Sequence, residues 1–177
     1  MEYSIEIMIS EAKVENRIKE LAKAIEKDHK NDQIIFIGLL KGSVLFMSEL
    51  IKNLNMPILI DFMSVSSYGA GTTSTGVVKI LKDVDFDIKD KNLMIVEDII
   101  DTGLTLKYVK EFLLSKGAKK VMITSLLDKP SRRKTDIHGD YIGFEIPDEF
   151  VVGYGLDYAQ KHRNLPYIGK VVMKNKQ

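Results

Sequence analysis

Hydrophobic residues along the chain form two patterns, continuous runs and recurrence at spacings of three and four. Their alternation predicts strands that alternate with helices. Runs without charged residues at 34–40 and 93–96 are typical of strands buried on both faces of a sheet. Elsewhere apolar residues recur at spacings of three and four, over 14–25, 46–54 and 106–113, as on the buried face of a helix. This order predicts an α/β fold with a mostly parallel, twisted sheet flanked by helices.

Residues with strong local preferences mark several element boundaries. Ser10 stands where an N-cap of the first helix is expected, and Gly117 stands where a C-cap glycine of the third is expected. Three glycines and several small hydroxyl residues predict a mobile loop at 66–76. Further strands are predicted at 58–65, 77–81, 120–127, 141–146, 151–154 and 167–173.

Length and composition narrow the class of protein. The 177 residues contain no repeat or linker, so we expect one domain over 1–177, with a core at about 30–145 and a small hood from about 1–10 and 146–177. The net charge of +1 offers no general attraction for nucleic acid. Absence of cysteine excludes thiol catalysis, and no apolar run is long enough for a membrane span. We therefore expect a cytoplasmic protein without a nucleic-acid or membrane partner.

The stretch from Glu97 to Thr105 concentrates the candidate chemistry. It reads Glu-Asp-Ile-Ile-Asp-Thr-Gly-Leu-Thr and joins a buried strand to a helix. Backbone N–H groups at a helix start can bind a phosphate, which Gly103 can approach closely and to which Thr102 adds a hydroxyl donor. The carboxylates of Glu97 and Asp98 suit sugar hydroxyls or Mg²⁺ instead. The pattern indicates a sugar-phosphate site, and an ordinary strand–turn–helix with capping acids is the alternative.

This stretch resembles the phosphoribosyl diphosphate motif of the type I phosphoribosyltransferases, in the form typical of their 6-oxopurine (hypoxanthine and hypoxanthine-guanine) branch. The resemblance extends roughly over 5–172. It implies transfer of phosphoribosyl from 5-phospho-α-D-ribose 1-diphosphate to N9 of hypoxanthine or guanine, with Mg²⁺ as cofactor and Asp101 as general base. The residues that it implies for phosphoribosyl diphosphate binding are Lys41, Gly42, Ser67, Tyr68, Glu97, Asp98, Asp101, Thr102, Gly103, Leu104, Thr105 and Arg163.

Two other segments are given roles by the same resemblance. Lys41 and Gly42 would hold the diphosphate, next to a cis peptide bond between Leu40 and Lys41. Ser67 and Tyr68 would belong to a lid that closes over the reacting centre and excludes water.

The purine would be recognised by residues from the second half of the chain. The resemblance places Lys129 at the 6-oxo group, Phe150 against the ring face, and the backbone of Val151 at the purine edge. Asp157 would bind a second Mg²⁺ near the 2-position of the base, so that the implied metal ligands are Glu97, Asp98 and Asp157.

Asp128 departs from the family pattern, which has an apolar residue before the lysine. Its carboxylate could pair with Lys129 or with Arg132, and base recognition would depend on which of these forms.

Two alternatives and two family properties stay open. A lysine at position 129 and an aromatic residue at 150 argue against adenine and uracil, but xanthine remains a candidate base. A nucleotide-sensing regulator that binds RNA could share the fold, although an acid at position 101 and the absence of a basic stripe favour catalysis. Family members are commonly homodimers or homotetramers, and guanosine tetraphosphate inhibits some bacterial ones at the diphosphate site. The resemblance raises both properties as expectations, and the residues themselves decide neither.

Overall fold

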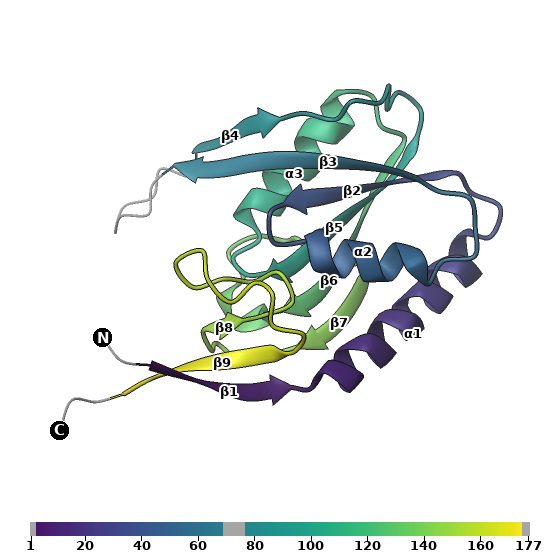
Figure 1. Ribbon diagram of the computed structural model, residues 1–177. Helices are drawn as coiled ribbons and strands as arrows, with labels where there is room; N and C mark the ends of the chain where they lie inside the picture. The colour runs from purple at the N-terminus through teal and green to yellow at the C-terminus, as the bar shows by residue number, and fades with distance from the viewer. Residues whose placement is uncertain (1–2, 69–76, 175–177) are drawn as a thin grey trace.

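The computed structural model of the protein describes residues 3–68 and 77–174, which form two sheets and three α-helices (Figure 1). The strands are β1 (Tyr3–Ile9), β2 (Ile34–Leu40), β3 (Leu59–Tyr68), β4 (Val77–Lys82), β5 (Asn92–Ile100), β6 (Lys120–Asp128), β7 (Tyr141–Glu145), β8 (Val151–Val152) and β9 (Ile168–Met173). The helices are α1 (Glu11–His29), α2 (Val44–Lys52), α3 (Leu104–Ser115) and the short 3₁₀ helix η1 (Pro130–Arg132). Within the described ranges, no helix has the length and hydropathy of a membrane span.

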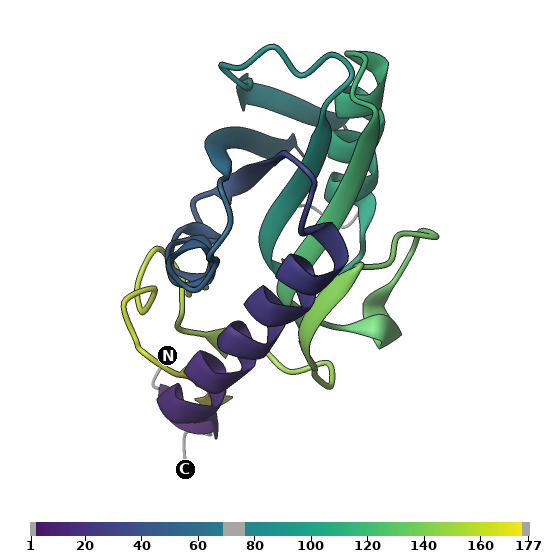
Figure 2. The same cartoon turned by 90° about the vertical axis from the view of Figure 1, so that its right-hand side faces the viewer.

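The larger sheet has the strand order β4-β3-β2-β5-β6-β7. All neighbouring strands are parallel except β3 and β4, so the antiparallel pair lies at one edge. Helices α1 and α2 cover one face of this sheet and α3 covers the other (Figures 1 and 2). The predicted α/β fold, with a mostly parallel sheet between helices, is therefore confirmed.

Strand β2 shows why the central strands are apolar throughout. Ile34 and Phe36 pack with α1 and α2, whereas Ile35 and Ile37 pack on the α3 side. Because successive side chains of a strand point to opposite faces, burial of both faces leaves no position for a charged residue.

A second, three-stranded sheet brings together the two ends of the described chain. β1 and β9 pair antiparallel, with Tyr3 opposite Met173, and β8 joins the other edge of β9 (Figure 1). The loop between β8 and β9 reaches the larger sheet, because Gly155 lies directly against the carbonyl oxygen of Gly42. This small sheet therefore holds its loop over the turn that follows β2.

Two strands run further than the sequence predicted. β5 continues to Ile100, so Glu97 and Asp98 lie within a strand rather than after it, because β6 supplies backbone partners as far as Asp128. β3 continues to Tyr68 through pairing with β4, so the predicted loop does not begin at residue 66. The rest of that predicted loop, 69–76, lies outside the described residues.

The predicted helix ends agree with the structure in position. Ser10 is the N-cap residue of α1, although its side chain makes no capping hydrogen bond. Gly117 follows the end of α3 with φ +93°, a conformation that glycine adopts without strain.

Candidate active site

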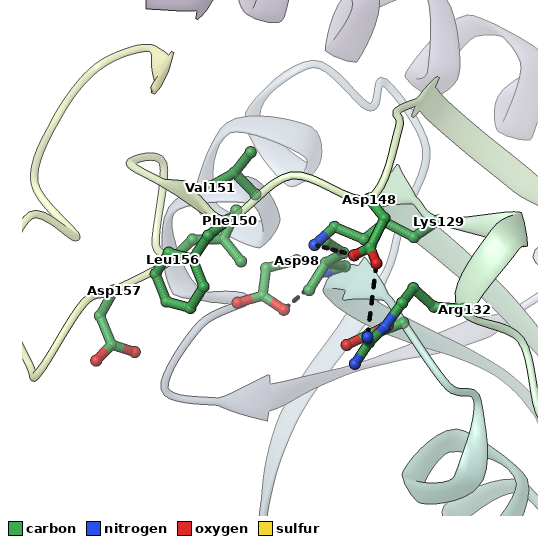
Figure 3. Close-up of a pocket in the computed structure, with 10 residues that line it drawn as sticks. Asp98, Lys129, Arg132, Asp148, Phe150, Val151, Leu156 and Asp157 are labelled. Atoms are coloured by element: carbon green, nitrogen blue, oxygen red, sulfur yellow. Dashed lines mark hydrogen bonds and ion pairs between the residues drawn. The ribbon is translucent and has the colours of Figure 1, made fainter. Parts of the chain in front are cut away.

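Three adjacent strands of the larger sheet place the candidate residues together at their carboxyl ends. β2, β5 and β6 are parallel neighbours, so Lys41, Asp101 and Lys129, which follow them directly, lie at the same side. Ligands of such sheets bind at the carboxyl ends of the strands. A cavity of about 450 Å³ opens there. Its lining residues are Asp98, Ile99, Asp101, Lys129, Arg132, Asp148, Phe150, Val151, Leu156 and Asp157 (Figure 3).

A smaller hollow of about 120 Å³ lies over the turn between β5 and α3. Its lining residues are Glu97, Ile99, Asp101, Thr102, Gly103, Thr105 and Leu106. Ile99 and Asp101 line both spaces, so the larger cavity and the smaller hollow meet at these two residues.

The turn has the backbone geometry of an anion site. Gly103 immediately precedes α3 with φ +80°, in the left-handed region that favours glycine. Its carbonyl accepts a hydrogen bond from the Lys107 N–H at 2.9 Å, which closes the first turn of the helix. The Thr102 hydroxyl oxygen accepts one from the Leu104 N–H at 3.4 Å. The positive end of the helix dipole is therefore directed at the smaller hollow.

The segment 128–134 forms an outer wall for this turn. The Lys129 N–H donates to the Ile100 carbonyl at 2.9 Å, and the Lys134 N–H donates to the Thr102 carbonyl at the same distance. Between them the Arg133 guanidinium donates to the Asp101 carbonyl. The chain that carries Lys129 thus fixes the turn by three hydrogen bonds.

Asp128 pairs with Arg133 and with neither residue that the sequence suggested. Both side chains are largely buried, because Asp128 is the last residue of β6 and Arg133 folds back over it. The departure from the family pattern therefore leaves the Lys129 ammonium available to the cavity.

A row of alternating charges crosses the larger cavity. The Arg132 Nε lies 3.1 Å from Asp101 Oδ1, and its Nη1 lies 3.5 Å from Asp148 Oδ2. The Lys129 Nζ lies 3.9 Å from Asp148 Oδ1, and only 9% of the Lys129 side chain is exposed. Asp148, together with Ile99 and Leu156, was missed as a site residue, and Arg132 was considered only as a partner of Asp128.

Phe150 and Leu156 form the opposite wall (Figure 3). Phe150 is 53% exposed, whereas Val151 beside it is 5% exposed and belongs to the core. A flat apolar face that is open to the cavity suits stacking against a heterocycle. Figure 3 shows Asp98 between this wall and the cationic side chains of Lys129 and Arg132.

Glu97 and Asp98 are crowded carboxylates whose charged forms are disfavoured. Burial raises the pKa of Asp98 to about 6, against the opposing effect of a 2.7 Å hydrogen bond from the Ile99 N–H. Burial, and then the charge of Asp98, raise the pKa of Glu97 well above its usual value. A divalent cation would favour both ionised forms, and Mg²⁺ commonly uses one or two carboxylates with substrate phosphates. Asp98 lines the larger cavity and Glu97 lines the smaller hollow, so each carboxylate has the chemistry of a Mg²⁺ ligand in its own space. The described residues contain no cluster of three metal-binding side chains.

The remaining predicted residues lie around this centre. Asp157 forms an ion pair with Arg163 at 2.6 Å, and Arg163 also donates to the Gly155 carbonyl at 2.7 Å. The peptide bond between Leu40 and Lys41 is cis, as the resemblance implied. The other positions are as follows: Gly42 lies against the Asp98 carboxylate, Lys41 and Leu104 are exposed, and Ser67 and Tyr68 contribute backbone to β3 while their side chains lie outside the description.

A small hollow at a helix start meets an aromatic-walled cavity, and this combination suits a sugar phosphate beside a flat base. The phosphoribosyl transferase domain family matches residues 8–159, and the chain belongs to this family. It is 50% identical over 175 residues to the hypoxanthine phosphoribosyltransferase of Salmonella typhimurium, covering 98% of each chain. It is 49% identical over 170 residues to the hypoxanthine-guanine phosphoribosyltransferase of Bacillus subtilis, covering 96% and 94%.

Solved structures agree with this family. A hypoxanthine-guanine phosphoribosyltransferase from Bacillus anthracis, crystallised with HEPES in its active site, superposes with a TM-score of 0.90 and 46% identity. The alignment covers 97% of this chain and 100% of that one. The resemblance inferred from the Glu97–Thr105 motif is confirmed.

Proposed function

We propose that the protein is a purine-salvage transferase that converts hypoxanthine, and also guanine, to the nucleoside 5′-monophosphate with 5-phospho-α-D-ribose 1-diphosphate as donor. The observation that carries this proposal is the meeting of the two spaces at Asp101. A 5′-phosphate in the smaller hollow and a base in the larger cavity would place the anomeric carbon between them. The names of the related enzymes support the same reaction.

Asp101 is proposed to act as the general base. N9 of the purine forms a bond to the anomeric carbon while the bond from that carbon to the diphosphate oxygen breaks, and the electron pair leaves with the diphosphate. The N7 proton of the base passes to the Asp101 carboxylate. Such a proton transfer typically contributes 10²–10⁴-fold, so positioning of the two substrates supplies much of the remaining rate enhancement.

The base is proposed to bind between the Phe150 ring and the row of charges. The Lys129 ammonium can donate to the 6-oxo group of hypoxanthine or guanine, where adenine has an amino group. The backbone of Val151 would read the other edge of the base. A buried donor left without an acceptor is costly, so this lysine selects against adenine.

Phosphoribosyl diphosphate is proposed to bind across the carboxyl ends of the central strands β2 and β5. The first turn of α3, with Thr102, Gly103, Leu104 and Thr105, would hold the 5′-phosphate. Glu97 and Asp98 would hold Mg²⁺ and the ribose hydroxyls, and a second Mg²⁺ would use Asp157. The metal would supply positive charge to the departing diphosphate.

The diphosphate itself is assigned to two further segments. Lys41 and Gly42 form the turn after β2, and Arg163 is hydrogen-bonded to Gly155, which lies against Gly42. Ser67 and Tyr68, the last residues of β3, would contribute to a lid that closes over the donor. Arg163 would have to exchange its ion pair with Asp157 for the substrate.

A direct assay tests the proposal. The purified protein is incubated with phosphoribosyl diphosphate, Mg²⁺ and, separately, hypoxanthine, guanine, xanthine, adenine or uracil, and nucleotide formation is followed by absorbance and chromatography. We expect inosine and guanosine monophosphates, with adenine and uracil unreactive. Efficient use of xanthine alone would show that xanthine, and not hypoxanthine or guanine, is the substrate of the same transfer reaction.

Two controls separate catalysis from the alternatives. Removal of Mg²⁺ with a chelator should abolish turnover, and its return should restore it. Salt-dependent RNA binding without nucleotide formation would support the regulator instead. Homodimer or homotetramer assembly and inhibition by guanosine tetraphosphate depend on the family resemblance alone, and light scattering and inhibition kinetics would test them.

A further inference from the structure

We propose that Arg132 is a positioning residue that orients the Asp101 carboxylate toward the N7 proton of the purine. This inference rests on the proposed function, because it assigns a helper to the general base of that reaction. It starts from the contact between the Arg132 Nε and Asp101 Oδ1, which are 3.1 Å apart at the boundary between the two spaces.

The backbone places Arg132 at this position. It is the last residue of η1, and its N–H donates to the Lys129 carbonyl at 3.1 Å. Lys129 is in turn bonded to the Ile100 carbonyl, next to Asp101 itself. Arg132 therefore belongs to the wall segment that is fixed to the turn, and its side chain starts from a defined point opposite the carboxylate.

The contact holds only one oxygen of the carboxylate. Arg132 bonds Asp101 Oδ1 through Nε, while its Nη1 is directed to Asp148 (Figure 3). Among residues 3–68 and 77–174, no donor is hydrogen-bonded to Asp101 Oδ2. One oxygen is thus fixed in place and the second remains available for the purine proton, which is the arrangement a general base needs.

Stability does not explain the pair. The side chains are 47% exposed for Arg132 and 42% exposed for Asp101, and ion pairs with this much solvent contact contribute little to folding. Asp148 holds the other side of the guanidinium, so Arg132 is anchored between two carboxylates instead of being free to bind a phosphate.

The test is a double-mutant cycle in steady-state kinetics. Arg132→Gln should lower kcat by about 10- to 100-fold, because misplacement of a catalytic group by about 1 Å has effects of this size. The KM for phosphoribosyl diphosphate should remain within about twofold. In the Asp101→Asn background the same substitution should cause no further loss, because its effect passes through the carboxylate. Arg132→Lys should recover part of the rate.

Arg17→Gln is the control, because Arg17 also forms an ion pair, with Glu20, but lies on α1 away from the cavity. Arg17 further donates to the Gly143 and Ile142 carbonyls, so the substitution removes at least as many contacts as Arg132→Gln. Its kcat should equal that of the parent protein, and thermal unfolding is measured for every variant. If Arg132→Gln fails to fold, Arg132→Lys takes its place in the cycle.

The possible results separate the two proposals. Unchanged kcat in the Arg132 variants, or equal losses with and without Asp101→Asn, would overturn the positioning role and leave the proposed function intact. A lower KM for the purine with unchanged kcat would show that Arg132 competes with the base for Asp101 and would also overturn it. If Asp101→Asn retained full turnover, the assignment of Asp101 as the general base would fail.

Discussion

The Phe150 ring that faces the cavity meets the Tyr158 ring edge-on, with centroids 5.4 Å apart and an interplanar angle of 77°. Tyr158 makes a similar contact with Tyr3 at 5.1 Å and 87°. The Tyr3 hydroxyl shares a hydrogen bond of 2.7 Å with His162 Nε2. An exposed aromatic residue in the candidate purine site is thus supported by a row of rings that ends in the first strand.

We expect Tyr158→Leu to raise the KM for the purine by about 2- to 10-fold, because an edge-on aromatic pair contributes about 0.5–1.5 kcal/mol beyond its burial. Steady-state kinetics with each substrate varied in turn measure the effect. Tyr158→Phe keeps the ring and is the control, with an expected KM near that of the parent. A purine KM that the leucine does not change would mean that Phe150 holds its orientation without Tyr158.

Asp101→Asn should leave the fold intact and reduce kcat by about 10²–10⁴-fold, the usual contribution of a general base. The amide keeps the size of the side chain but cannot accept the N7 proton as a carboxylate does. Pre-steady-state kinetics and thermal unfolding, measured together, separate lost chemistry from lost structure. A variant with the parent rate would remove this residue from the proton transfer.

Gly42→Ala should impair binding of the sugar donor, since a Cβ on Gly42 would overlap the Asp98 carboxylate. Displacement of Asp98 should raise the KM for phosphoribosyl diphosphate by about tenfold or more. Titration of Mg²⁺ and donor in the kinetic assay measures this change.

Gly117→Ala is the contrasting control. Gly117 lies after α3 at φ +93°, so alanine should cost about 1–2 kcal/mol of unfolding free energy without altering either KM. Donor kinetics that respond equally to both substitutions would count against a local effect of Gly42.

Asp61 should make stability depend on pH. Burial alone would raise the pKa of this carboxylate, but backbone hydrogen bonds from Asp85, Phe62 and Phe86 and the charge of Lys82 lower it below the ordinary value of 3.8. The folded state therefore binds a proton at Asp61 more weakly than the unfolded chain. The resulting stabilisation is fully present above about pH 4 and is lost as the pH falls through the folded-state pKa.

Asp61→Asn should lower the unfolding free energy at pH 7 by about 1–3 kcal/mol and flatten its decline below about pH 4. Urea unfolding between pH 7 and pH 3 measures both effects. Asp87→Asn is the control, because Asp87 is exposed in the turn whose backbone Asp61 bonds. Its hydrogen bond from the Lys89 N–H can be kept by the amide oxygen of asparagine, so neither quantity should change. An equally steep acid decline in the Asp61 variant would exclude the carboxylate as its source.

Local pattern accounts for much of the fold and for the centre of the site. The apolar runs of β2 and β5 required burial on both faces, and the Gly103 turn combined a left-handed glycine with a helix start. These features arise from residues close together in the chain, so their physics is visible in the sequence.

Other parts depend on partners that are distant in the chain. Arg132 and Asp101 are separated by 31 positions, and their contact requires the register between β5 and β6. The extension of β5 through Glu97 and Asp98 has the same cause, because a neighbouring strand supplies hydrogen bonds that outweigh the preference of charged residues for a loop. Asp128 forms its ion pair with Arg133 because η1 turns the chain back over β6.

The hydrogen bonds between the segment 128–134 and the turn after β5 have a consequence for enzyme engineering. Lys129 would determine which nucleobase is accepted. The backbone segment that carries it is hydrogen-bonded to the turn that would hold the sugar phosphate. Attempts to broaden the range of accepted nucleobases by reshaping this segment should therefore weaken donor affinity at the same time. Libraries directed at Phe150 and Leu156, across the cavity, would avoid that penalty.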